Sequence, residues 1–229
     1  MNLPLTHVTP WENFRKIAID EFLLPKPCRF FKEELIYLNF GRLAYKPSKK
    51  DYNWNENSPV IIFFNNRLLD KCNRYFPFDT GAILAGRFRA TNLNSKKLKE
   101  KFAFDLKKST PENWINSIYS SNLEYIEHKM PSLITNNNEI NHLLIEAYNQ
   151  LEKNDELDYR LTSIECHSKV PISIKNSFLV IIPNDKKDEF SKLKISSALN
   201  VSFYSDLSQN GYLPHDLSTK ANKIFTQLS

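Results

Sequence analysis

The chain has 229 residues, and lysine and arginine outnumber the acidic residues enough to give a formal net charge of +5. Hydrophobic residues make up 41% and charged residues 25% of the chain, which is ordinary for a globular protein. This length suits one large domain with a buried core, and the basic balance permits an acidic partner such as nucleic acid without requiring one.

Several classes of protein are excluded by what the sequence lacks. No apolar run approaches the ~20 residues that span a bilayer, and no signal peptide is visible, so we expect a cytoplasmic protein with no membrane partner. The cysteines at 28, 72 and 166 match neither a disulfide framework nor a zinc site, and we expect no metal. Glycine is scarce, at 4 residues, and neither GxGxxG nor GxxxxGK occurs, which argues against a glycine-rich phosphate loop.

The first elements along the chain are a strand and a helix. Residues 3–8 read as a strand. Thr9 then resembles an N-cap, with Pro10 at the first helical position and Glu12 completing a capping box. Apolar side chains recur at helical spacing through residue 20, at Trp11, Phe14, Ile17 and Ala18. His7 therefore lies two residues before the predicted start of a helix.

The middle of the chain is predicted to be mostly helical. A strand at 34–40 ends at Gly41, which permits a tight turn, and the apolar run 60–64 predicts a central strand. Polar loops are expected at 46–58 and 130–138. The helical patterns lie at 67–74, 93–104, 111–120 and 139–152.

The last third returns to strands, predicted at 160–166, 170–174 and 178–183, with a final helix at 216–227. No internal repeat is evident. This order of elements predicts an α+β fold and a single domain over 1–229, in which 93–152 forms a helical insertion.

Glu165 is the leading candidate for a functional residue. It lies in the strand-like stretch Thr-Ser-Ile-Glu-Cys-His, although strands disfavour glutamate and a buried carboxylate is costly unless it is paired. The structural alternative is a sheet edge or an ion pair with Arg160 or Lys169. In a regular strand His167 shares the face of Glu165, while Cys166 points away.

Two other stretches carry side chains that would suit a pocket around Glu165. One holds His7 and Thr9, and the other holds Tyr37 and Tyr45. Cleavage of the bond between nicotinamide and ribose needs a carboxylate for the developing cation, an aromatic face for the ring and hydrogen-bonding groups for ribose. The alternatives are a structural hydrogen bond for His7 and core or rim positions for the tyrosines.

Two further positions extend this candidate pocket. Gly41 and Arg42 would form its wall, where the guanidinium could hold a pyrophosphate bidentately, the alternative being a surface charge. Asp79 either faces the pocket or caps the turn in Asp-Thr-Gly.

This layout resembles the His–Tyr–Glu branch of the ADP-ribosyltransferases, which includes diphtheria toxin and the poly-ADP-ribose polymerases. The opening Leu-Thr-His-Val-Thr-Pro-Trp-Glu-Asn-Phe-Arg-Lys-Ile is also similar to the start of DarT-type bacterial toxins. The resemblance implies a split antiparallel β-sheet core with flanking helices. It also implies that His7 and Thr9 orient ribose, that Tyr37 and Tyr45 clamp nicotinamide, and that Glu165 stabilises the oxocarbenium ion.

The same resemblance implies a function. NAD would be the substrate, and ADP-ribose would pass to a macromolecule, with nucleic acid favoured over protein. Ser163 replaces the Gln or Glu that arginine-modifying enzymes carry two residues before the catalytic glutamate, which disfavours arginine as acceptor. The chain would act as a bacterial toxin or antiphage effector, held in check by an antitoxin or inhibitory protein. The alternatives are an NAD glycohydrolase and a non-catalytic module that binds nucleic acid or protein on the same fold.

Overall fold

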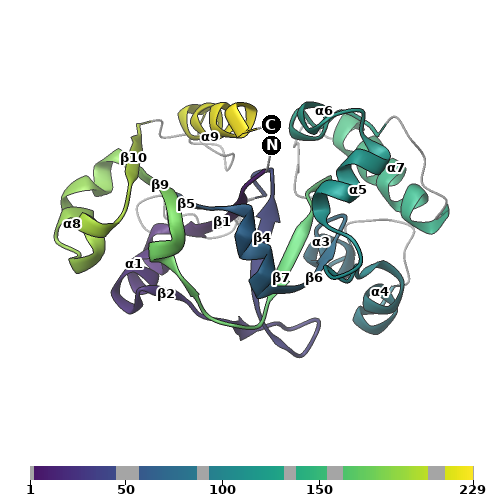
Figure 1. The fold of residues 1–229 in the computed structure, drawn as a ribbon, viewed down its shortest axis with the longest axis horizontal. Helices are drawn as coiled ribbons and strands as arrows, with labels where there is room; N and C mark the ends of the chain where they lie inside the picture. The colour runs from purple at the N-terminus through teal and green to yellow at the C-terminus, as the bar shows by residue number, and fades with distance from the viewer. Residues whose placement is uncertain are drawn as a thin grey trace.

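A mixed β-sheet with flanking helices forms the centre of the computed structural model, and this confirms the α+β prediction (Figure 1). The structure describes residues 3–44, 57–86, 93–131, 138–153, 162–205 and 215–228. Within these ranges no helix is both long and apolar enough to cross a membrane.

The main sheet follows the order β10-β9-β5-β1-β4-β7-β6, and β3 pairs with β4 beside this path. Every described strand pair is antiparallel except β9 with the edge strand β10, which are parallel. A separate ribbon joins β2 to β8. The strands are β1 (Leu5–Pro10), β2 (Phe22–Leu23), β3 (Lys26–Pro27), β4 (Glu34–Phe40), β5 (Pro59–Phe64), β6 (Cys72–Phe76), β7 (Glu165–Ser168), β8 (Ile172–Ser173), β9 (Ser177–Pro183) and β10 (Val201–Tyr204).

The sheet opens between β1 and β4. These strands pair only at Leu5↔Phe40 and Thr6↔Asn39, whereas β1 pairs with β5 over all six of its residues. Beyond Thr6 the ladder between β1 and β4 ends, and the imidazole of His7 reaches the Tyr37 carbonyl. The opening therefore places a side chain where a regular sheet would place a backbone hydrogen bond.

The helices gather in two groups (Figure 1). One group, made of α3 to α7, lies beside β6 and β7. At the opposite end of the sheet, α8 lies beside β10. The last helix, α9, contacts α6. The α-helices are α1 (Trp11–Asp20), α3 (Thr80–Leu84), α4 (Ser95–Phe102), α5 (Pro111–Ile118), α6 (Asn122–Ile126), α7 (Asn138–Lys153), α8 (Lys187–Ser191) and α9 (His215–Leu228). Short 3-10 turns occur at Asn66–Lys71, Ile174–Asn176, Asn184–Lys186 and Lys194–Ala198. The helices α4 to α7 come between β6 and β7 in the sequence, yet β6 and β7 pair directly with each other. The segment 93–152 is therefore inserted between two neighbouring strands of the sheet.

The predicted start of the first helix is wrong by one residue. Thr9 and Pro10 continue β1 and pair with Val60 and Pro59, so the helix begins at Trp11 and no side chain caps it. Pairing with the buried strand β5 therefore takes precedence over the local capping pattern. The predicted apolar face of this helix is confirmed, since its four apolar residues are all buried.

Two other boundaries differ from prediction because strands pair across the sheet. The helix predicted at 67–74 is a 3-10 turn that ends at Lys71, and the next residues form β6 against β7. The strand predicted at 160–166 begins at Glu165, where pairing with both β4 and β6 starts. Residues 154–161 lie outside the described ranges.

Candidate functional site

A pocket of about 370 Å³ lies where β1 and β4 separate. Its wall includes the three leading candidates, His7, Tyr37 and Glu165, which come from β1, β4 and β7. The other lining residues are Val8, Cys28, Arg29, Phe30, Asn39, Ala44, Asp79 and Gly81. The volume is at the lower end of the range of ligand sites, which is about 300–1,000 Å³.

His7 enters the pocket as a neutral imidazole with a defined tautomer. Its Nδ1 lies 2.9 Å from the Tyr37 carbonyl oxygen, and because a carbonyl only accepts, Nδ1 carries the proton. Burial lowers the pKa of His7 more than this hydrogen bond raises it, and the charge of Lys26 lowers it further. Nε2 is therefore left as a hydrogen-bond acceptor, which suits a hydroxyl group of a ligand.

Tyr37 is held in place by a thiol and a ring. Its hydroxyl donates to Cys28 Sγ at 2.7 Å, and its ring meets the His167 ring edge-on, with 4.7 Å between centroids. Burial, as the largest cause, raises the pKa of Tyr37 well above its usual value, so the phenol stays protonated. The side chain is thus neutral and has a fixed orientation before any ligand arrives.

Glu165 is only 6% exposed, yet it lines the pocket. Its Oε1 accepts one hydrogen bond from Thr80 Oγ1 at 2.5 Å and a second from His167 Nε2 at 2.6 Å. Burial raises the pKa of Glu165 to about 8, although the Thr80 hydroxyl, the Thr80 backbone N–H and the charge of Arg74 all act to lower it. At this pKa the carboxyl group is mostly protonated at pH 7. The prediction that His167 shares the strand face of Glu165 is confirmed, since the two side chains are in contact.

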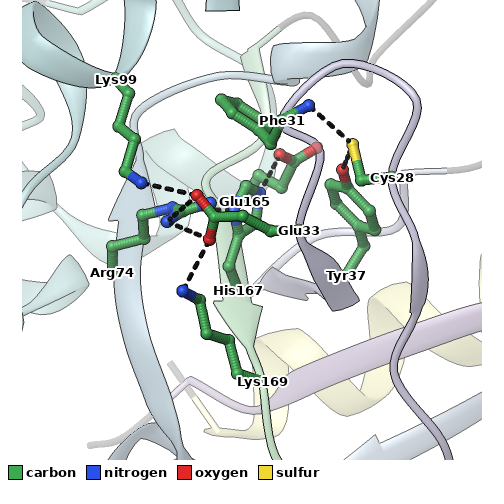
Figure 2. Close-up of polar contacts among 9 residues, drawn as sticks. All are labelled: Cys28, Phe31, Glu33, Tyr37, Arg74, Lys99, Glu165, His167 and Lys169. Atoms are coloured by element: carbon green, nitrogen blue, oxygen red, sulfur yellow. Dashed lines mark hydrogen bonds and ion pairs between the residues drawn. The ribbon is translucent and has the colours of Figure 1, made fainter. Parts of the chain in front are cut away.

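A chain of polar side chains leads from His167 to the surface (Figure 2). Arg74 Nε donates to His167 Nδ1 at 3.1 Å, and Arg74 Nη1 forms an ion pair with Glu33 Oε2 at 3.0 Å. Glu33 also pairs with Lys99 at 2.6 Å and with Lys169 at 2.8 Å. Hydrogen bonds from these three cations lower the pKa of Glu33 to about 2 against the effect of its burial. Lys169, one predicted structural partner of Glu165, thus pairs with Glu33 instead.

Three of the predicted site residues lie outside this pocket, and a fourth is not among the described residues. Thr9 is buried, 4% exposed, in β1 opposite Val60, and is not among the lining residues. Gly41 lies in a turn with φ +63°, where an added Cβ would approach Leu3 Cδ1 to 2.6 Å, so packing explains this glycine. Tyr45 lies outside the described residues.

Arg42 is the third predicted residue that lies outside this pocket, and its side chain is buried in the core. It is 1% exposed, and its guanidinium donates to the carbonyl oxygens of Tyr125 and Thr162 and lies 3.7 Å from the centroid of the Tyr125 ring. It lines a different pocket, of about 310 Å³, between the end of β4, α6 and α9. A guanidinium that already serves these carbonyls is not available to a pyrophosphate in the first pocket.

Sequence reasoning missed several lining residues. Arg29 and Phe30 belong to a turn closed by the hydrogen bond from the Cys28 amide to the Glu33 carbonyl, and no motif marked this turn. Asp79 satisfies both interpretations made of it, since it caps α3 through the Ala82 amide at 2.8 Å and also lines the pocket. The Asp-Thr-Gly signal therefore pointed to the neighbourhood of Glu165.

The described residues hold no group of three or more His, Cys, Asp or Glu side chains that could bind a metal ion. Comparison of the sequence with models of known protein families finds no matching family, and comparison with functionally curated proteins finds no match either. The function is therefore argued from the geometry and chemistry of the pocket.

Proposed function

We propose that this protein is an NAD-dependent ADP-ribosyltransferase with an ADP-ribosyltransferase-like split sheet. The observation that carries the proposal is that His7, Tyr37 and Glu165, which come from three hydrogen-bonded strands in that order, line one pocket at the opening of the sheet. A set of His, Tyr and Glu on three strands is the arrangement that the resemblance implies.

In the proposed reaction the bond between nicotinamide and ribose breaks, and its electron pair leaves with nicotinamide. The ribose carbon becomes an oxocarbenium-like centre, which the acceptor attacks as it loses a proton. A carboxylate beside that centre stabilises the positive charge where it develops. Glu165 supplies this group from a position that is 6% exposed, where water screens the interaction little.

The raised pKa of Glu165 fits this role through the charge of the substrate. With a pKa of about 8, Glu165 is mostly the neutral acid at pH 7 before substrate binds. The nicotinamide ring of NAD is cationic, and an opposite charge nearby favours the ionised carboxyl group. Substrate binding would therefore convert Glu165 into the carboxylate that the reaction needs.

The other lining residues would bind and orient NAD. His7 Nε2 accepts from a ribose hydroxyl, and Tyr37 and Phe30 supply aromatic surface for nicotinamide. Arg29 is the arginine of this pocket wall, so we assign to it the pyrophosphate contact that the sequence suggested for Arg42. A role for Tyr45 in clamping nicotinamide remains part of the proposal.

The acceptor and the biological setting rest on the resemblance to DarT-type toxins. Nucleic acid is the preferred acceptor, consistent with the net charge of +5, and protein is the second choice. We propose a toxin or antiphage effector that an antitoxin or inhibitory partner controls in the cytoplasm.

The test is release of nicotinamide from labelled NAD by the wild type and by Glu165→Gln. Loss of a single transition-state contact of this kind costs about 10²- to 10³-fold in kcat, and we expect a loss in that range. Glu34→Gln is the matched control, because it makes the same chemical change at an exposed position of β4 and should leave the rate unchanged.

The products distinguish the candidate functions. Transfer of label to DNA or RNA supports the proposal as stated, and transfer to protein supports the second acceptor. Release that depends on Glu165 but on no macromolecule identifies an NAD glycohydrolase. Absence of NAD binding, or equal rates in the wild type and the Gln variant, would contradict the enzymatic function and leave the non-catalytic binding module.

A further inference from the structure

We propose that His167 and Arg74 are positioning residues for Glu165: a neutral imidazole of fixed tautomer holds Oε1 and thereby turns Oε2 toward the pocket. This inference rests on the proposed function, in which Glu165 stabilises the ribosyl cation. The sequence pattern placed His167 on the strand face of Glu165 but gave it no defined role, and it did not single out Arg74.

The tautomer of His167 follows from geometry. An arginine nitrogen can only donate, so His167 Nδ1, 3.1 Å from Arg74 Nε, must be the acceptor. The ring proton is then on Nε2, which lies 2.6 Å from Glu165 Oε1. A doubly protonated ring would direct an N–H against Arg74, so the ring stays neutral. Burial and the charge of Arg74 also lower the pKa of His167 well below its usual value.

One oxygen of the Glu165 carboxyl group, Oε1, accepts two hydrogen bonds from side chains. A carboxyl oxygen has two lone pairs, and here Thr80 Oγ1 and His167 Nε2 take both. Because Oε1 already accepts these two bonds, a protonated Glu165 favours its proton on Oε2, and in the ionised form Oε2 is the oxygen that these two side chains leave to face a cation. The orientation of the carboxyl group is thus determined before NAD binds.

Arg74 is itself held in place by an ion pair and by aromatic rings. Its side chain is 6% exposed and is held between the ion pair with Glu33 and the aromatic rings of Phe31 and Phe76, whose centroids lie 5.1 and 5.9 Å from its Cζ. Ring contacts also surround His167, so neither member of the chain can rotate freely (Figure 2). A locked partner of this kind pre-organises the residue it contacts.

The charged and titratable groups around Glu165 come from several elements. His167 belongs to β7, Arg74 to β6, Tyr37 to β4 and His7 to β1, while Asp79 precedes α3. In this set, only His167 and Arg74 belong to the chain that contacts Oε1. A change in the pKa of Glu165 when His167 is substituted therefore shows that the contacts from Arg74 through His167 act on Glu165.

The test is a matched pair of variants, His167→Asn and His167→Gln. Asn places an amide near the former Nδ1 and retains a partner for Arg74, but it is too short to reach Glu165. Gln places an amide near the former Nε2 and restores a donor to Oε1. Cys166→Ala is the control, because Cys166 lies on the same strand and points to the opposite face.

We expect kcat for nicotinamide release to fall about tenfold in His167→Asn, and KM for NAD to stay within about twofold. A loss of this size is typical when a residue that orients a site residue through a hydrogen bond is removed. His167→Gln should recover most of the rate, and Cys166→Ala should keep it. In His167→Asn the rising limb of the pH profile should also move to higher pH, because a carboxylate that loses a donor has a higher pKa.

Titration of the Glu165 carboxyl carbon by NMR provides a readout that does not need activity. Its signal is identified by its absence in Glu165→Gln. If wild type releases no nicotinamide, the proposed function fails, and the NMR titration still decides whether His167 acts on Glu165. A Glu165 pKa that is the same in wild type and both His167 variants, or equal losses of kcat in Asn and Gln, would overturn the proposal.

Discussion

Two buried arginines of this protein serve different purposes. Arg42 is 1% exposed and donates to neutral carbonyl oxygens of Tyr125 and Thr162, whereas Arg74 is 5% exposed and connects Glu33 to His167. The first binds the end of β4 to α6 and to the chain entering β7. The second binds a surface carboxylate to the candidate site. Burial of an arginine therefore does not by itself indicate function, and the acceptors it serves distinguish the two cases.

The largest expected effect comes from Arg42→Met. This variant removes the arginine donor from the Thr162 and Tyr125 carbonyls, although the Tyr125 carbonyl keeps the His128 amide, and hydrogen bonds to charged groups contribute about 1.5–3 kcal/mol each. We expect the free energy of unfolding to fall by about 3 kcal/mol, measured by urea denaturation. Nicotinamide release per folded molecule should stay within twofold of wild type. A large loss of kcat in the folded fraction would contradict the structural role.

A smaller loss of stability is expected from Glu33→Gln, which removes the acid that anchors Arg74. The buried guanidinium loses its charged partner, but Lys99 and Lys169 are half-exposed and become hydrated, so we expect a loss of about 2 kcal/mol at pH 7.

The dependence of this loss on pH identifies its cause. The pKa of Glu33 is lowered in the folded protein, to about 2. Its contribution to stability is therefore complete above the unfolded-state pKa of about 4.3 and disappears as pH falls toward 2. The difference between wild type and variant, measured by thermal unfolding, should narrow over that window. A difference independent of pH would show that the charge of Glu33 is not responsible.

The smallest expected effect is the dependence of kcat/KM for NAD on pH. The free enzyme needs an ionised Glu165, and burial raises the pKa of that group to about 8. The rate should therefore rise with pH, reach half its plateau near pH 8 and be about tenfold below the plateau at pH 7. The same profile should appear in Arg42→Met, because Arg42 does not contact the site. A profile that is flat between pH 6 and 8 would contradict the assigned ionisation.

Short-range patterns predicted much of the fold. The strand at 34–40 and the apolar face of the first helix were correct, because periodicity of 2 or 3.6 residues reflects which side of one element is buried. The errors occur where a distant strand decides the outcome. Residues 72–74 were predicted as helix, yet they pair with β7, and Thr9 was predicted as a helix cap, yet it pairs with Val60.

In the candidate site, too, local sequence predicted the residue types, whereas contacts between distant segments decided which residues meet. Glu165, His7 and Tyr37 could be singled out by residue type, and the structure brings them to one pocket. Arg29 could not be preferred over Arg42, since each arginine lies beside a turn and neither turn carries a distinguishing motif. The choice between them depends on where α6 meets the end of β4, which joins residues more than eighty positions apart.

The sequence by itself determined the periodic elements and the chemical types available to a pocket, because both are properties of neighbouring residues. Only the tertiary structure decided which groups meet. The chain from Glu33 through Arg74 and His167 to Glu165 joins β6 to β7 and to the turn before β4. Such contacts depend on strand order and on the opening of the sheet, and no local pattern encodes them.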